Sequence, residues 1–446
     1  MSVGDAGTGR PPRRVADLSA PFWIAHRGMA NVYPENTLEA YRGTVALGVD
    51  VVEPDCWRTR DGGLVCLHDA TVDRTTDGSG NTDELTMPGA ELLHVDAGTW
   101  FAAAWPNTLR VPTLTDVLDE LGGQAVLCPE AKNAGAGRVI VDRLTQHGLL
   151  DAAIVQSFMR AELGPAVAAG GDAMMLTATS AYDPAALHAS GIRYLGLSAA
   201  LPPSLVSPAT HAGLDVVTWV VNRRVDAAPW LAAGAIGFFS DDPLYLSGRS
   251  PVLTSDPFGQ RTYYHGHLAS SIAGDRGTFS APHAWGYADT SPAYKGALQG
   301  WASPINGAAT DRFGLTFTVC IDAAATQDGW AGAFISATDD RSFDDTGHYQ
   351  PGLGGYHVVL RQSGNLELHI VNHGIATLAS CAATPPIEPG GTATLRIDVA
   401  PTQVAATRTG VAPTAAVTVP DATHRGGYLH LGRRAAAVRF SDIAIS

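Results

Sequence analysis

The sequence predicts an α/β fold, a TIM (β/α)8 barrel, in the first half of the chain and an all-β sandwich of jelly-roll type in the second half. In the first half, short apolar segments alternate with polar loops and Ala/Leu-rich helical stretches. From about residue 314 onward, apolar residues recur with a period of two, which is typical of half-buried antiparallel strands. The length of 446 residues is enough for two or three domains.

This change of pattern also predicts the domain boundaries. A tail at 1–20 precedes the barrel at 21–247. A polar, proline-containing linker follows at 248–257, and the sandwich occupies 258–446. Within the sandwich, Ser363-Gly364-Asn365 is predicted to form a hairpin turn between two strands.

Eight apolar segments are the predicted barrel strands. They lie at 22–26, 49–53, 125–130, 153–157, 173–176, 193–197, 216–220 and 236–240. This number of strands in roughly 250 residues is what a (β/α)8 barrel requires. Because the carboxyl ends of parallel barrel strands open onto one face, we expect polar residues at those ends to converge there.

Composition and charge narrow the class of protein. Hydrophobic residues make up 45% and charged residues 16% of the chain, as in a globular protein. A net charge of −14 disfavours nucleic acid and anionic bilayers as partners. We find no apolar run long enough for a membrane span and no export signal, so we expect a cytoplasmic protein. Five cysteines without a CxxC pair predict neither a disulfide framework nor a zinc site.

Three carboxylates stand at predicted strand ends. Glu53 and Asp55 are two residues apart, so their side chains point to the same side of a regular strand, and Glu130 ends the next strand. Neighbouring carboxylates repel each other unless a cation lies between them. Oxygen ligands of this kind suit Mg²⁺ or Ca²⁺. The alternative is an ordinary salt-bridge network with Arg or Lys.

Two histidines are candidate acid/base groups. His26 ends the first predicted strand and is followed by the permanent cation of Arg27. His68 closes a predicted hairpin with the turn Asp61-Gly62-Gly63, which brings its imidazole over the barrel mouth. An imidazole suits proton transfer at neutral pH, although a single histidine in a sequence is more often structural.

Further residues complete the predicted pocket. Lys132 provides a flexible cation that suits a phosphate oxygen. Trp219 either walls the pocket or is a core aromatic. Asn36 is predicted to cap a helix, with Glu39 at the third helical position, and contact of Asn36 with substrate is the alternative.

An ordered set of short motifs runs through the first half: HRG, PENT, GVDVVEPD, TRDGGLVCLHD, DRTTDGSG, PEAK, QSF, TWVVN and SDDP. Over residues 22–245 this set resembles the glycerophosphodiester phosphodiesterase family, which are phospholipase-C-like TIM barrels. The resemblance implies a divalent metal, Mg²⁺ or Ca²⁺, held by three carboxylates, a pair of acid/base histidines and two cations that contact the phosphate. In this sequence they are Glu53, Asp55 and Glu130; His26 and His68; and Arg27 and Lys132.

The resemblance implies metal-dependent hydrolysis of small glycerophosphodiesters to glycerol 3-phosphate and an alcohol. We expect His26 to act as base and His68 as acid, while attack by water and attack by the substrate's own 2-hydroxyl group both stay open. Pro54 and Pro129 depart from the family pattern, which usually has an aliphatic residue at these positions. Proline removes a backbone donor and fixes φ, so we expect either a tilt of the adjacent carboxylates or a disturbance of barrel pairing there.

The second half is similar in pattern to concanavalin-like and laminin-G-like sandwiches. Such modules often bind sugars, so one expectation is glycan contact and the other is support of the barrel fold. The matching alternative for the whole chain is a protein that binds a glycan or teichoic-acid-type polymer and has a barrel of little or no activity. The acidic segment 339–345 is either a Ca²⁺ site or a solvated loop. Trp301 and Trp330 either stack on a sugar or are buried.

Overall fold

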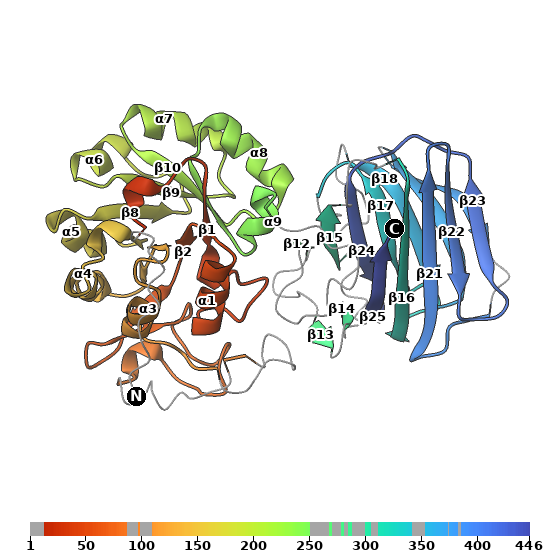
Figure 1. Cartoon of the computed structure of the whole chain (residues 1–446), viewed down its shortest axis with the longest axis horizontal. Helices are drawn as coiled ribbons and strands as arrows, with labels where there is room; N and C mark the ends of the chain where they lie inside the picture. The colour runs from red at the N-terminus through yellow and green to blue at the C-terminus, as the bar shows by residue number, and fades with distance from the viewer. Residues whose placement is uncertain are drawn as a thin grey trace. The chain divides into compact units, whose positions relative to one another are not determined.

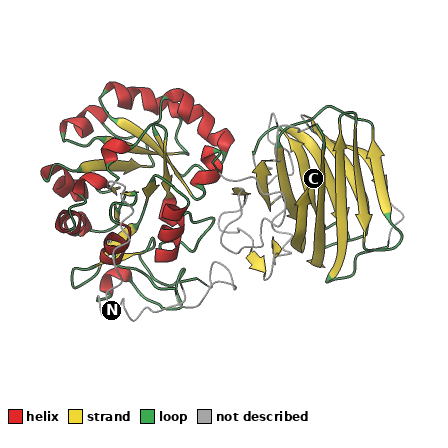
Figure 2. Ribbon diagram, in the orientation of Figure 1, coloured by secondary structure: helices red, strands yellow, loops and turns green. Residues whose placement is uncertain are grey.

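The computed structural model divides the chain into two compact units (Figure 1). The first comprises most of the chain up to Ser247, and the second comprises Gly248–Ser446 together with short earlier segments such as Arg223–Val225. Helices and strands alternate in the first unit, whereas the elements described in the second are strands (Figure 2). The structure describes residues 13–86, 97–98, 109–249, 267–269, 278–280, 284–287, 299–304, 311–340, 353–372, 374–381 and 385–446.

Parallel strands of the first unit close into a ring. β1 pairs with β2 on one side and β11 on the other. The pairing continues from β2 to β5, from β3 through β6 to β7, and on through β8, β9 and β10 to β11. These strands are β1 (Phe22–Ala25), β2 (Val51–Val52), β3 (Asp55–Arg58), β5 (Val126–Leu127), β6 (Glu130–Ala131), β7 (Ile154–Ser157), β8 (Asp172–Thr177), β9 (Tyr194–Ser198), β10 (Asp215–Trp219) and β11 (Gly237–Ser240). Each predicted strand is present, which confirms the barrel.

Helices lie around the outside of the ring (Figure 1). They are α1 (Leu38–Ala46), α3 (Leu114–Leu121), α4 (Ala136–Gln146), α5 (Arg160–Ala168), α6 (Pro184–Ala189), α7 (Val206–His211), α8 (Arg224–Ala233) and α9 (Pro243–Ser247). Short 3-10 helices are η1 (Val15–Asp17), η2 (His26–Gly28), η3 (Thr82–Glu84), η4 (Leu150–Ala152) and η5 (Pro203–Leu205). Because side chains alternate along each strand, Ile24 and Met174 join a cluster inside the ring, whereas Val52 and Val155 pack in the layer toward the helices.

Two prolines interrupt neighbouring barrel strands. Pro54 separates β2 from β3, and Pro129 separates β5 from β6, because proline has no N–H for the ladder. Their carbonyl groups nevertheless accept hydrogen bonds from the neighbouring strand: Pro54 O from Glu130 N at 2.9 Å, and Pro129 O from Gln156 N at 3.0 Å. The prolines therefore break the ladder locally and leave the ring closed.

The first turn of α1 differs from the sequence expectation. The residue that caps α1 is Thr37, whose side chain accepts from Ala40 N. The prediction that Asn36 caps this helix was wrong. Asn36 has a φ of 54°, and its amide is turned toward Asp55. The buried Asp55 carboxylate requires a hydrogen-bond donor, which Asn36 provides. The hydroxyl of Thr37, one residue later, caps the helix instead.

The predicted hairpin after β3 is confirmed. β3 pairs in antiparallel register with β4 (Leu64–Cys66), so that Cys56 lies opposite Cys66 and Arg58 opposite Leu64. Gly62, in the turn, has a φ of 91°, a conformation that glycine adopts readily. The hairpin returns the chain toward the barrel mouth just before His68.

Among the residues that the structure describes, the second unit has two antiparallel sheets of seven strands each. One has the order β12-β15-β24-β17-β18-β19-β20 and the other β13-β14-β25-β16-β21-β22-β23. The strands are β12 (His267–Ala269), β13 (Thr278–Ser280), β14 (Ala284–Tyr287), β15 (Gln299–Pro304), β16 (Phe313–Ala324), β17 (Trp330–Ala337), β18 (Gly354–Arg361), β19 (Leu366–Asn372), β20 (Ile375–Cys381), β21 (Gly391–Ala400), β22 (Gln403–Thr409), β23 (Ala415–Val419), β24 (Tyr428–Arg434) and β25 (Ala436–Ile445). Alternate residues such as Leu315 and Phe317 of β16 form a shared core with Val358 and Leu360 of β18. This confirms the sandwich, and Gly364 lies in the predicted turn between β18 and β19.

Other sequence expectations have mixed outcomes. The five cysteines are free in the structure. No helix among the described residues is long and apolar enough to cross a membrane. Trp330 is only 6% exposed, so burial is the alternative that applies to it. Residues 250–257 of the linker, 341–345 of the acidic segment and the Trp301 side chain lie outside what the structure describes.

Candidate active site

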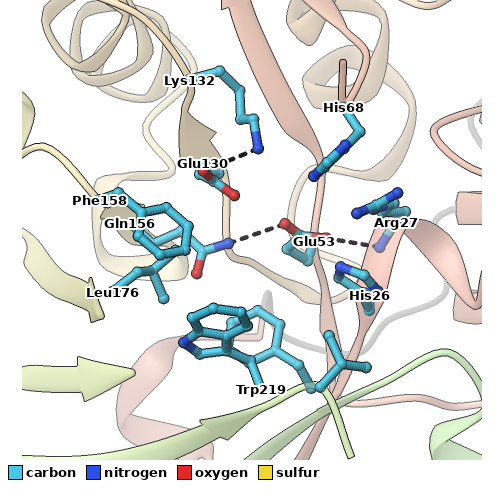
Figure 3. Close-up of a pocket in the computed structure, with 12 residues that line it drawn as sticks. His26, Arg27, Glu53, His68, Glu130, Lys132, Gln156, Phe158, Leu176 and Trp219 are labelled. Atoms are coloured by element: carbon cyan, nitrogen blue, oxygen red, sulfur yellow. Dashed lines mark hydrogen bonds and ion pairs between the residues drawn. The ribbon is translucent and has the colours of Figure 1, made fainter. Parts of the chain in front are cut away.

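A pocket opens at the carboxyl ends of the barrel strands (Figure 3). Its volume is about 490 Å³, part of it open to solvent. Charged and acid/base side chains form one part of its wall, and apolar side chains form another. The lining residues are His26, Arg27, Glu53, His68, Glu130, Lys132, Gln156, Phe158, Leu176, Trp219, Val220 and Phe239.

The three predicted metal carboxylates lie together. Asp55 does not line the pocket, but Glu53, Asp55 and Glu130 each offer an oxygen, and these oxygens all lie within 4.8 Å of one another. Asp55 and Glu130 are partners in the parallel register of β3 and β6, which explains their proximity. All three side chains are buried.

Electrostatics within this cluster are unfavourable without a cation. Burial, followed by repulsion from Asp55 and Glu130, raises the pKa of Glu53 well above its ordinary value. Burial and the Asp55 charge raise the pKa of Glu130 to about 7. Burial also acts to raise the pKa of Asp55, but the charges of Lys132 and Arg27 outweigh it and hold that pKa below its ordinary value.

Neighbouring groups fix two of these carboxylates in place. Glu53 accepts a hydrogen bond from the backbone N of Arg27 at 2.7 Å and another from Gln156 Nε2 at 3.1 Å. Asp55 Oδ2 accepts from Asn36 Nδ2 at 2.9 Å, and Asn36 Oδ1 accepts from the backbone N of Asp55 at 3.2 Å. Each carboxylate thus keeps its orientation while part of it stays available to a ligand.

The two predicted phosphate-binding cations flank the cluster. Lys132 Nζ lies 3.1 Å from Glu130 Oε1 and 3.4 Å from Asp55 Oδ1, and Arg27 Nε lies 3.5 Å from Asp55 Oδ2. The salt-bridge network that the sequence left as an alternative is therefore present. It does not satisfy every acceptor, because Asp55 Oδ1 is buried without a hydrogen-bond partner. Three close carboxylates with an unsatisfied oxygen fit a hard divalent cation.

His26 is held by an aspartate from the far end of the barrel sequence. Its Nδ1 lies 2.6 Å from Asp241 Oδ1. Asn222 donates from Nδ2 to the other oxygen of Asp241 at 2.6 Å and accepts from the backbone N of Asp241 at 2.8 Å. With Nδ1 engaged, Nε2 is the ring atom of His26 that remains for proton transfer.

His68 has a matching arrangement from a different segment. Its Nδ1 lies 2.6 Å from Asp69 Oδ1, and Arg74 donates to the same aspartate. Arg74 also donates to Glu35, which accepts from Arg27 at 3.0 Å, so one chain of contacts links His68 to Arg27. Burial lowers the pKa of His68 below its ordinary value. Figure 3 shows His26 and His68 on either side of Glu53.

Aromatic side chains line the part of the pocket across from Arg27. Trp219 and Phe158 meet edge to face, with ring centroids 5.3 Å apart. Trp219 Nε1 donates to Gly196 O at 3.0 Å, which fixes the indole as a pocket wall. Two further lining residues, Gln156 and Phe158, were not predicted from the sequence, although both belong to the QSF motif at the end of β7.

Paired acid/base groups beside a candidate cation site and two fixed positive charges suit the hydrolysis of an anionic ester. The fold and the site together define a barrel hydrolase of phosphoric esters. More particularly, the chain belongs to the glycerophosphoryl diester phosphodiesterase family, whose model matches residues 26–245.

Known proteins similar to this chain match its barrel. A glycerophosphodiester phosphodiesterase of Caldanaerobacter subterraneus is 30% identical over 234 residues, 49% of this chain and 93% of that protein. A putative glycerophosphodiester phosphodiesterase of Bacillus subtilis is 30% identical over 236 residues, 50% of this chain and 96% of that protein. The solved structure of an Oleispira antarctica phosphodiesterase, in complex with the product sn-glycerol-3-phosphate, is 27% identical with a TM-score of 0.48, covering 52% of this chain and 96% of that one.

Proposed function

We propose that this chain hydrolyses glycerophosphodiesters to glycerol 3-phosphate and an alcohol, and that the reaction depends on a divalent cation, Mg²⁺ or Ca²⁺. The observation that supports this most is the convergence of three buried carboxylates and two aspartate-bound imidazoles on one pocket. Family membership supports the substrate class.

Glu53, Asp55 and Glu130 would hold the cation. A cation bound there would offset the carboxylate charges and stabilise negative charge on a phosphoryl oxygen. The guanidinium of Arg27 and the ammonium of Lys132, which both line the pocket, would bind the remaining phosphate oxygens. Trp219 would exclude water from the apolar side of the substrate.

His26 is proposed as the general base and His68 as the general acid. Asp241 Oδ1 lies 2.6 Å from His26 Nδ1 and would orient the ring so that Nε2 takes the proton of the attacking hydroxyl. The lowered pKa of His68 makes its protonated form a stronger donor toward the leaving alcohol. A trapped cyclic phosphate would show that the attacking group is the substrate's own 2-hydroxyl, and its absence in a rapid quench would favour water.

A panel of glycerophosphodiesters, assayed with EDTA and after Mg²⁺ or Ca²⁺ is added back, tests this proposal. We expect release of glycerol 3-phosphate that EDTA stops and one of the two cations restores. Turnover that is indifferent to EDTA would refute the metal dependence. Absence of turnover on the whole panel, together with glycan binding that survives Glu53→Ala, would favour the polymer-binding alternative instead.

A further inference from the structure

Two thiols that the proposed reaction does not use face each other in the barrel. Cys56 follows Asp55 in β3, and Cys66 is the last residue of β4, two positions before His68. The two cysteines are directly opposite in the antiparallel register of this hairpin. Both are free and fully buried.

The peptide groups of these cysteines point away from each other. Cys56 O accepts from Lys132 N at 3.0 Å, on the β6 side of its strand. Cys66 N donates to Pro112 O at 2.8 Å, on the opposite side of β4. The Cys56 carbonyl and the Cys66 N–H are therefore not hydrogen-bonded to each other.

The adjacent pair makes the ladder hydrogen bond instead. Leu67 N donates to Asp55 O at 3.0 Å, which identifies Asp55 and Leu67 as a hydrogen-bonded pair. Because the two kinds of pair alternate in an antiparallel ladder, Cys56 and Cys66 form a non-hydrogen-bonded pair. The Cα atoms of such a pair are typically about 4.5 Å apart, at the lower end of the range that a disulfide spans.

The two thiols share one environment and are in contact. Both belong to the apolar layer between the strands and the helices, and a side-chain contact joins Cys56 to Cys66. β4 has three residues and lies at the end of the strand order of its sheet, and its outer side is held by the hydrogen bond from Cys66 N to Pro112 O and by the bridge between Val65 and Thr113. Local opening of so short a strand would give an oxidant access to Cys66.

We infer that Cys56 and Cys66 form a reversible cross-strand disulfide, a redox modification site in the hairpin that connects Asp55 to His68. A low-molecular-weight disulfide such as oxidised glutathione is the oxidant. The Cys66 thiolate attacks one of its sulfurs and releases one thiol; the Cys56 thiolate then attacks the Cys66 sulfur and releases the second. Two protein thiols are oxidised to one disulfide, and the oxidant is reduced to two thiols that take up the two protons.

The position of the bond within the hairpin predicts its effect on stability. A link between Cys56 and Cys66 restricts the unfolded hairpin, so we expect the oxidised barrel to have a Tm roughly 3–8 °C above that of the reduced barrel.

Folded full-length protein, incubated with glutathione buffers of increasing oxidised fraction, tests the inference. Intact mass is measured after acid quench and alkylation, and a non-reducing digest maps the linkage. We expect loss of two hydrogens, a peptide that joins Cys56 to Cys66, the rise in Tm, and reversal by dithiothreitol. Cys66→Ala should abolish all of these, whereas Cys128→Ala, which removes another buried barrel thiol, should change none of them.

Three results would overturn the inference. One is full alkylation of all five cysteines under every buffer that oxidises a reference dithiol. Another is a linkage that maps to a different pair. The third is a glutathione adduct on either cysteine that does not proceed to the internal disulfide. All of these readouts are independent of turnover, so failure of the proposed phosphodiesterase activity would leave them unaffected.

Discussion

In the barrel, Glu53, Asp55 and Glu130 are buried beside one another, and the pKa of both glutamates is raised. In the sandwich, buried polar groups are neutral or hydrogen-bonded. Burial lowers the pKa of His430 to about 4, so its ring is neutral at pH 7. The buried Arg408 guanidinium donates to three backbone carbonyls, those of Gly364, Pro385 and Pro413.

The difference shows two solutions to the cost of burying polar groups. The sandwich buries its charge singly: two nitrogens of Arg408 donate to backbone carbonyls, although its Nε has no partner, and the ring of His430 is neutral. The barrel keeps like charges close together and leaves an acceptor of Asp55 unsatisfied, which costs stability until a ligand binds. We therefore expect changes in the pocket to affect turnover more than stability, and changes in the sandwich interior to do the opposite.

The largest expected effect is on turnover. His26→Ala and His68→Ala should each lower kcat by about 10²–10⁴, the usual contribution of a general acid or base, with little change in circular dichroism or Tm. The exposed barrel residue His211 offers a matched control, because His211→Ala should leave kcat unaltered. Wild-type kcat in either pocket variant would remove that histidine from the mechanism.

Substitutions in the sandwich interior should change the free energy of unfolding instead of turnover. Arg408→Met removes the donors of three carbonyl groups, so it should lower the free energy of unfolding by about 2–4 kcal/mol. The exposed Arg396, which pairs with Asp398 on the same strand, is the matched control, and Arg396→Met should cost less than about 1 kcal/mol. Urea unfolding of both variants measures this. Equal losses would contradict the contrast between the two regions.

Acid should weaken the sandwich through buried histidines with a lowered pKa, of which His430 is one. The pKa of His430 is about 4 when folded and near 6.5 when unfolded, so between these values the unfolded chain binds more protons. Stability should therefore fall as pH drops from about 6.5 toward 4, by about 1.4 kcal/mol per pH unit from this residue. His430→Gln retains a donor for Asp339 O without titrating, so its unfolding free energy should depend less on pH. Identical pH profiles would rule out the effect.

Protons and the cation should compete in the barrel. Because the pKa of Glu130 is raised to about 7, a proton must leave before the cation binds at lower pH. Mg²⁺ or Ca²⁺ affinity should fall about fivefold between pH 7 and pH 6, as measured by calorimetric titration. The Glu130→Gln variant should bind the cation more weakly, and its affinity should depend much less on pH. A wild-type affinity that is constant over this range would show that Glu130 is not a ligand.

Much of the barrel and its site was predictable because the signals are local. Apolar segments ended by polar residues predicted the strands, and Asp61-Gly62-Gly63 predicted the hairpin that returns His68 to the barrel mouth. Carboxylates two residues apart, with a third at the next strand end, predicted the cluster because parallel strands align their carboxyl ends.

Tertiary structure alone decided the partners of these residues. Asp241 orients His26 from 215 positions away, and Gln156 reaches Glu53 across 103 positions, only because the ring closes in this register. Asn36 is another residue whose partner could not be predicted locally. Its sequence pattern predicted a helix cap, but in the structure its side-chain amide donates to the buried Asp55. Periodicity and turn residues determine conformation over a few neighbours, whereas hydrogen-bond partners and pKa values depend on which distant groups burial brings together.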